Sequence, residues 1–261
     1  MSGFILAKSQ LSFIPAMSYQ FAIDVGNTMV KIGIFRHDRL IRKYTYTRLT
    51  YKTLVLLGKR YLPVSAIVSS VVEVPAFLLR YLNSIPHSVL LQPDTPVPIK
   101  NHYRSKSTLG SDRLAGVVGA FSLFKGRNVL VIDAGTCIKY DFLDKGGNYH
   151  GGSISPGISM RLRALHEQTG KLPLITSADI ATFQGNDTRT SILTGVIKGA
   201  SFEIEGFVKR YKKEYSRLVV ILTGGDAVSL SKHLNFSIFA APDLLMIGLN
   251  SILLHDSLPH S

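Results

Sequence analysis

Two stretches of the chain decide its fold: residues 21–35 read FAIDVGNTMVKIGIF and residues 130–143 read LVIDAGTCIKYDFL. Each contains an apolar run, an Asp-x-Gly turn with a Thr close behind it, and a second run that alternates with the period of a β-strand. A strand-turn-strand unit that occurs twice predicts two related halves facing one another. We therefore expect two α/β domains with a cleft between them.

The segments around these units alternate between strand and helix patterns. Apolar runs predict strands at residues 21–25, 30–35, 40–46, 66–70, 87–91, 128–133 and 217–222. Helical spacing predicts helices at residues 51–61, 75–82, 111–124, 158–168, 188–211 and 243–254. We expect one domain at residues 17–127 and another at 128–261, and the glycine-rich segment 146–157 receives no assigned element.

The first sixteen residues, MSGFILAKSQLSFIPA, stand apart from this pattern. Lys8 falls inside their apolar part rather than ahead of it, so they do not form a clean signal peptide. Met17 lies just before the first predicted strand. We expect translation to begin there and residues 1–16 to be a tail or a mis-assigned start.

The composition narrows the class of protein. The chain has 261 residues, 46% of them hydrophobic, and Cys137 is its one cysteine. These values exclude a disordered chain and a disulfide framework, and no uncharged apolar run reaches the ~20 residues of a membrane-spanning helix. A soluble intracellular protein is expected. The net charge of +13 favours anionic partners, but charge alone does not choose among nucleic acid, membrane and phosphorylated small molecules.

The two Asp-x-Gly turns have the features of a phosphate-binding site. Gly26 lets the first turn take a positive φ and lets a phosphate approach the main chain, and Asp24 can hold a hydrated Mg²⁺. Asn27, Thr28 and Lys31 add donors and charge, while Asp133-Ala134-Gly135-Thr136 and a glycine turn at residues 224–225 supply further contacts. Two ordinary hairpins are the alternative. P-loop and dinucleotide-binding motifs do not occur in the sequence.

A second candidate site is Gly110-Ser111-Asp112-Arg113, at the start of a predicted helix. Phosphoryl transfer needs a carboxylate that takes the acceptor's proton, and Asp112 suits that role. An Asp in the first turn of a helix is also an ordinary capping residue. Spacing alone does not decide between the two interpretations.

These motifs, in this order, resemble those of the type III pantothenate kinases, bacterial enzymes of the acetate and sugar kinase/Hsp70/actin superfamily. The likeness runs from about Tyr19 to Leu254 and includes residues 24–28, 110–113, 133–136, 152–157 and 224–226, with Thr188 at the start of a long helix. It implies two duplicated ribonuclease H-like (actin-like ATPase) domains around a nucleotide cleft. After Thr136 the chain reads Cys137-Ile138-Lys139-Tyr140, where the family often has small residues and another Thr.

The resemblance also implies a role for each matching residue. Asp112 would be the catalytic base, and Asp133 would bind an activating K⁺ or NH₄⁺ ion. The ATP contacts would be Asp24, Val25, Gly26, Asn27, Thr28, Met29, Val30, Lys31 and Thr136. The pantothenate contacts would be Tyr103, Gly110, Ser111, Asp112, Arg113 and Thr188. Family members are cytoplasmic homodimers that need Mg²⁺, and the partner subunit helps to close the pantothenate pocket.

The expected function is ATP-dependent phosphorylation of pantothenate to 4′-phosphopantothenate, the first step of coenzyme A biosynthesis. Neither a nucleic-acid nor a membrane partner is expected. Two alternatives remain open: a kinase-like transcriptional accessory factor, and a superfamily enzyme that acts on another small hydroxylated or carboxylate substrate. Tyr103, the segment 110–113 and Thr188 are the residues that favour pantothenate.

Overall fold

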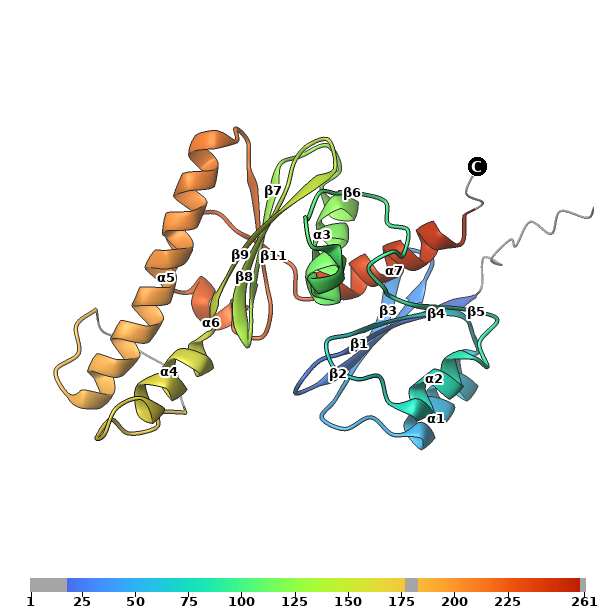
Figure 1. Cartoon of the computed structure of the whole chain (residues 1–261), viewed down its shortest axis with the longest axis horizontal. Helices are drawn as coiled ribbons and strands as arrows, with labels where there is room; N and C mark the ends of the chain where they lie inside the picture. The colour runs from blue at the N-terminus through green and yellow to red at the C-terminus, as the bar shows by residue number, and fades with distance from the viewer. Residues whose placement is uncertain (1–17, 177–182, 259–261) are drawn as a thin grey trace, which may run out of the picture.

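The computed structural model describes residues 18–176 and 183–258. The predicted tail at residues 1–16 and the predicted start at Met17 lie outside the described residues. Two β-sheets form the framework of the molecule, and helices lie between and outside them (Figure 1). No helix within residues 18–176 and 183–258 has the length and apolar character needed to span a bilayer.

The first sheet has the strand order β3-β2-β1-β4-β5. Its strands are β1 (Tyr19–Val25), β2 (Val30–Arg36), β3 (Arg39–Tyr46), β4 (Pro63–Ser70) and β5 (His87–Leu90). The first three form an antiparallel meander, and β4 and β5 continue parallel to β1. Helices α1 (Tyr51–Tyr61) and α2 (Ala76–Leu82) cover one face, where Leu54 and Leu78 pack on Phe21 and Ile23.

The second sheet repeats this design. Its strands are β7 (Val129–Ala134), β8 (Cys137–Leu143), β9 (Asn148–Pro156), β10 (Val219–Thr223) and β11 (Phe239–Ala240). They follow the order β9-β8-β7-β10-β11, with the same parallel and antiparallel neighbours as in the first sheet. The predicted duplicated α/β fold is therefore confirmed.

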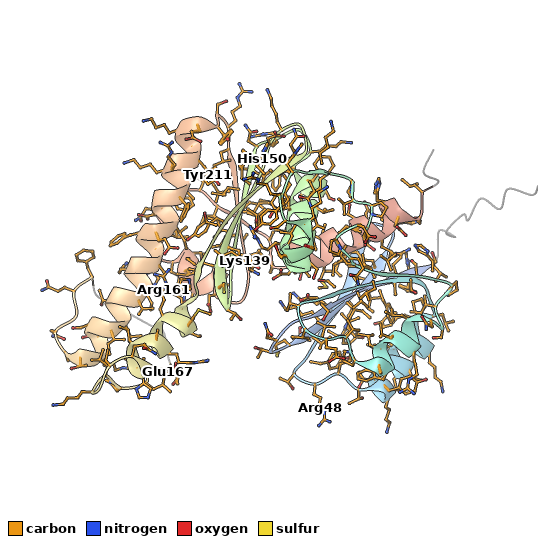
Figure 2. All side chains as sticks on the ribbon, viewed as in Figure 1. Arg48, Lys139, His150, Arg161, Glu167 and Tyr211 are labelled. Atoms are coloured by element: carbon orange, nitrogen blue, oxygen red, sulfur yellow. The ribbon has the colours of Figure 1, made fainter. Side chains whose placement is uncertain are left out.

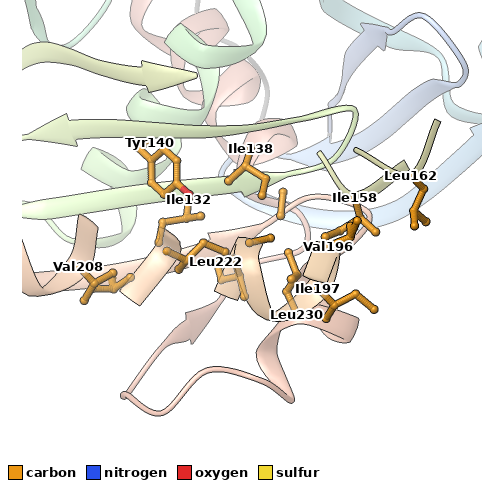
Figure 3. Packing of buried hydrophobic residues seen from close by; sticks show 14 of the residues in the cluster. Ile132, Ile138, Tyr140, Ile158, Leu162, Val196, Ile197, Val208, Leu222 and Leu230 are labelled. Carbon is orange, nitrogen blue, oxygen red and sulfur yellow. The ribbon is translucent and has the colours of Figure 1, made fainter. Parts of the chain in front are cut away.

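Helices cover both faces of the second sheet. Helices α4 (Ile158–Glu167), α5 (Thr188–Glu214) and α6 (Ala227–Ser231) lie on its outer face. There Val196 and Ile197 of α5 pack against Ile132 and Ile138 of the sheet (Figure 3). On the other face, Ala120 of α3 (Ser111–Leu123) and Leu244 of α7 (Leu244–Asp256) pack against Val131.

Helices α3 and α7 join the two sheets. Their buried side chains share one cluster with Ala22 and Ile67 of the first sheet and with Leu143 and Tyr149 of the second. Strand β6 (Lys100–Asn101) pairs with β9 of the second sheet, although it precedes residue 127. The domain boundary between residues 127 and 128 stays a prediction.

The sequence patterns located the long elements well but missed β6, β9, β11, α6 and the short 3₁₀ helix at Lys106–Thr108. The glycine-rich segment without an assigned element contains β9. Gly152 is required there, because a Cβ atom at this position would lie 1.6 Å from the carbonyl oxygen of Tyr140 on β8. The glycines that allow β9 to pair closely with β8 are also residues that disfavour the prediction of a strand from sequence, so β9 was missed.

Candidate functional site

Asp24 and Asp133 occupy equivalent positions at the ends of β1 and β7. In the first sheet Asp24 lies opposite Lys31 of β2 and Ser69 of β4. In the second sheet Asp133 lies opposite Lys139 of β8 and Thr223 of β10. Each half therefore presents an aspartate between a lysine and a hydroxyl residue.

Asp112 lies between the two halves of the molecule. It is in the first turn of α3, the helix that packs against both sheets. Its Oδ2 atom lies 2.6 Å from Nζ of Lys139, and the same Nζ lies 2.7 Å from Oδ2 of Asp133. Figure 2 shows where Lys139 lies in the molecule. The other oxygen of Asp112, Oδ1, accepts a hydrogen bond from the backbone N–H of Arg113 at 2.8 Å. One oxygen of the carboxylate therefore bonds to the first turn of α3, and the other contacts Lys139 of the second sheet.

Burial, together with the charges of this cluster, shifts the pKa of Asp24. Burial raises its pKa from 3.8 to about 6, Lys31 and Lys139 oppose that rise, and the carboxylates of Asp112 and Asp133 add to it. Burial opposes the charged form of Lys139 as well, but Asp133 and Asp112 outweigh it and raise the pKa of the ammonium group. The cluster therefore keeps Lys139 charged and makes the ionisation of Asp24 unfavourable.

The raised pKa predicts that Asp24→Asn stabilises the protein at neutral pH. Below pH ~4 Asp24 is protonated in the folded and the unfolded chain, so the variant and the wild type should be equally stable. Between pH ~4 and ~6 the unfolded chain ionises first, and the wild type loses stability relative to the variant. Above pH ~6 the difference in unfolding free energy should level off at roughly 1 to 3 kcal/mol.

Urea unfolding of both proteins between pH 4 and 8, without nucleotide or Mg²⁺, measures this difference. Asp38→Asn, the same change at an exposed residue of the turn after β2, is the control and should show no such pH-dependent gain. A wild type more stable than Asp24→Asn at pH 8 would contradict the assigned cause.

The two turns leave polar groups open to a ligand. Asn27, Thr28 and Thr136 are exposed, and the N–H of Gly26 donates to the carbonyl oxygen of Met29 at 3.0 Å. The positive φ expected at Gly26 was wrong, since Gly26 is not one of the described glycines with a left-handed backbone. The tight hairpin between β1 and β2 therefore forms without a left-handed residue at Gly26.

A left-handed glycine occurs at the third turn instead. Gly224 has φ +98°, and a Cβ atom there would lie 2.2 Å from the carbonyl oxygen of Ala134 and 2.6 Å from Oδ1 of Asp133. The third glycine turn therefore packs directly against the second Asp-x-Gly turn. The sequence predicted a glycine turn here but not its contact with the second Asp-x-Gly turn.

Arg113 lies beside Asp112 but points to a different partner. Its Nη2 lies 2.6 Å from Oδ1 of Asp141 on β8, and the hydroxyl of Tyr149 donates to the same oxygen at 2.6 Å. The guanidinium lies over the ring of Tyr103, 5.3 Å from its centroid, and Nη1 lies 3.4 Å from the Tyr103 hydroxyl. Tyr103 and Arg113, both predicted pantothenate contacts, thus lie together.

Strand β8 carries one basic and one acidic side chain that pair with the acidic and basic residues at the start of α3. Lys139 and Asp141 are two residues apart, so both point from β8 toward α3, where they meet Asp112 and Arg113. On the neighbouring strand Ile154 lies opposite Lys139 on the same face and is exposed. Sequence reasoning assigned no role to Lys139, Asp141 or Ile154 individually, although the alternation of Lys139 and Asp141 along a predicted strand was a usable signal.

A cavity of about 320 Å³ opens at the start of α3 and is lined by Gly110, Ser111, Ser70, Lys106 and Thr108 among others. The hydroxyl of Ser111 accepts from Ser69 at 2.9 Å and donates to the carbonyl oxygen of Ser70 at 3.1 Å, which fixes the helix start to the end of β4. The predicted substrate residues Gly110 and Ser111 therefore line a pocket of the first half.

Thr188 does not lie with the other predicted substrate residues in the single chain. It is the exposed first residue of α5, on the outer face of the second sheet, whereas α3 lies on the inner face. Asp187 caps the helix by accepting from the backbone N–H of Thr190 at 2.8 Å. Within one chain the structure does not bring Thr188 to the residues around Asp112.

The described residues contain no group of three or more His, Cys, Asp or Glu side chains arranged to hold a metal ion. Asp24 could hold Mg²⁺ only together with water and phosphate oxygens, as the hydrated ion usually binds. Asp133 is different, because the ammonium of Lys139 already contacts the carboxylate that the resemblance assigns to a monovalent cation. The residues present do not fit a second cation beside it.

The two sheets and their helices define the fold class, the duplicated ribonuclease H-like (actin-like ATPase) fold. A Listeria monocytogenes protein named as an N-acetylmannosamine kinase superposes with a TM-score of 0.55 at 14% identity, covering 92% of this chain and 100% of that one. A Campylobacter jejuni protein named for the Baf family of transcriptional activators gives a TM-score of 0.57 at 19% identity, covering 90% and 98%. Both likenesses show the fold alone.

The sequence identifies the family within this class. Residues 20–210 match the family model of type III pantothenate kinase. A type III pantothenate kinase of Bacteroides fragilis is 43% identical over 232 residues, which cover 88% of this chain and 96% of that protein. The corresponding protein of Phocaeicola vulgatus is 42% identical with the same coverage. The chain belongs to the type III pantothenate kinase family.

Proposed function

We propose that the protein transfers the γ-phosphoryl group of ATP to the primary hydroxyl of pantothenate, giving 4′-phosphopantothenate for coenzyme A synthesis. Membership of the family supports the reaction. The single structural observation that supports it best is the contact of both Asp112 and Asp133 with Lys139, with Asp24 of the first half within electrostatic range of all three. The family match does not favour the transcriptional factor or another substrate class.

The proposed nucleotide contacts are the two turns. The residues from Asp24 to Lys31, together with Thr136, offer exposed hydroxyl, amide and backbone groups to the phosphates. Asp24 would hold Mg²⁺ through water, and this ion supplies positive charge that neutralises the phosphate oxygens. A K⁺ or NH₄⁺ ion at Asp133 stays an implication of the resemblance, and the ammonium group of Lys139 competes with it for the carboxylate.

Asp112 is the proposed base that takes the proton of the pantothenate hydroxyl. A carboxylate can do so while accepting two hydrogen bonds, because its two oxygens offer about four acceptor positions. Gly110, Ser111, Tyr103 and Arg113 would orient the substrate. Arg113 is buried against Asp141 and donates a hydrogen bond to the hydroxyl of Tyr103, so it would orient pantothenate directly and by positioning the Tyr103 side chain.

We also propose a homodimer, which would let Thr188 of one copy reach the site of the other. Among the described residues of α4, α5 and the segment between them, four large apolar side chains are exposed: Met160, Leu174, Phe183 and Phe202. The rings of Phe183 and Phe202 lie 6.4 Å apart. An apolar surface of this kind is typical of a protein interface.

Phe202→Ser is expected to shift the molecular mass toward 28.7 kDa from twice that value, because it puts a polar group into the interface. Light scattering after size exclusion at micromolar concentration measures the mass. Val228→Ser, at an exposed apolar residue of α6, should leave the dimer intact. A wild type that elutes as a monomer at 50 µM would contradict the proposal.

The remaining proposals concern the cellular location of the protein and its binding partners. We propose a cytoplasmic protein that does not bind nucleic acid, with its net charge of +13 serving to attract ATP and the pantothenate anion. Binding to duplex DNA that weakens steeply with salt would favour the accessory-factor alternative instead.

A coupled assay with ATP, Mg²⁺ and pantothenate, with mass spectrometry of the product, tests the activity. We expect a product one phosphoryl group heavier than pantothenate. A panel of sugars and acetate under the same conditions separates other superfamily kinases. Consumption of ATP only with one of those substrates would refute the assignment while leaving the fold unchanged.

A further inference from the structure

Lys139 is the one lysine of the described residues whose ammonium group contacts carboxylates from both α3 and β7. It approaches Asp112 at 2.6 Å and Asp133 at 2.7 Å, and its side chain is only 16% exposed. Burial raises the cost of leaving such a group without partners, so its position is strongly determined by the two carboxylates.

The cluster needs a cation at this point. The carboxylates of Asp112 and Asp133 both approach one ammonium group, and both raise the pKa of the buried Asp24. Lys31 lies opposite Asp24 on β2 and serves the first half, whereas Lys139 lies opposite Asp133 on β8 and reaches Asp112 as well. Removal of the Lys139 charge would leave Asp112 and Asp133 facing each other without compensation.

We propose that Lys139 is a built-in cation, which makes the enzyme independent of added K⁺ or NH₄⁺. The ammonium group takes the place at Asp133 where the family resemblance assigns a dissociable monovalent ion, and it positions Asp112 at the same time. The inference rests on the proposed phosphoryl transfer for its kinetic test, but the cation site itself can be tested without catalysis.

The first test compares the initial rate of the wild type in KCl, NH₄Cl, NaCl and choline chloride at one ionic strength. The rates are expected to agree within about two-fold. A wild-type rate at least ten-fold higher in KCl than in choline chloride would overturn the proposal.

The second test uses three variants under the same salts. Lys139→Ala opens a space between two carboxylates, so its rate in choline chloride should fall at least 100-fold and recover at least ten-fold in KCl or NH₄Cl. Lys139→Met fills the space without charge and should not recover. Lys31→Ala, the same change at the equivalent register position of the first sheet, should lose activity without recovery. Equal rates of Lys139→Ala in all salts would contradict the idea.

A third test needs no turnover. KCl is expected to raise the melting temperature of Lys139→Ala relative to choline chloride by several degrees, and to leave the wild type and Lys139→Met unchanged. If the wild type makes no product in any salt, the proposed function fails while this measurement still decides on the cation site. If Lys139→Ala does not fold, a wild-type melting temperature that rises with KCl but not with choline chloride would overturn the proposal.

Discussion

Replacement of Asp112 by Asn is expected to lower kcat roughly 10³-fold, within the 10² to 10⁴ range of general base catalysis. The amide oxygen can still accept the hydrogen bond from the N–H of Arg113, so the start of α3 should keep its geometry. The amide has no basic oxygen to take a proton from the substrate hydroxyl, and it removes one of the two negative partners of Lys139. Catalysis should therefore fall far more than stability.

Steady-state kinetics and urea unfolding of the same preparation measure the two effects. We expect the unfolding free energy to change by about 1 to 2 kcal/mol, because Lys139 keeps Asp133 as its second carboxylate partner. Asp38→Asn serves as the matched control and should keep the wild-type kcat. An Asp112→Asn enzyme with undiminished turnover would remove Asp112 from the role of base.

The sequence predicted those features of the site that depend on neighbouring residues. A strand that ends in Asp-x-Gly places its carboxylate at a sheet edge whatever the rest of the chain does, so Asp24 and Asp133 could be located from the repeat alone. The Gly-Ser-Asp-Arg segment could likewise be assigned to a helix start, and α3 does begin at Ser111. The exposed groups at both turns follow from the same local patterns.

The missing features depend on which segments far apart in the chain meet. The local pattern puts Lys139 and Asp141 on one face of a strand. It does not indicate that they meet Asp112 and Arg113, because that requires α3 to lie against the second sheet. Thr188 was grouped with the substrate residues through the resemblance, yet α5 lies on the other face of that sheet. Long-range packing, rather than local propensity, decides both cases.

Removal of the carboxylate in Asp141→Ala is expected to lower the free energy of unfolding by about 3 to 5 kcal/mol. The side chains of Arg113 and Asp141 are 5% and 4% exposed, and Nε and Nη2 of Arg113 both donate to the carboxylate. Without Asp141 the guanidinium is buried with Tyr103 as its remaining described side-chain partner, and the hydroxyl of Tyr149 loses its acceptor. A buried charge without compensation is among the costliest defects that one substitution can introduce.

Urea unfolding followed by far-UV circular dichroism measures this loss, since the chain has no Trp for fluorescence. Glu214→Ala, which breaks the exposed Arg210–Glu214 pair, should cost about 0.5 kcal/mol or less and provides the matched control. The double variant Arg113→Met/Asp141→Leu should recover most of the stability, because it removes both charges together. It should stay inactive if Arg113 orients pantothenate, so that stability and activity separate. An Asp141→Ala protein within about 1 kcal/mol of the wild type would show that solvent or another group compensates Arg113.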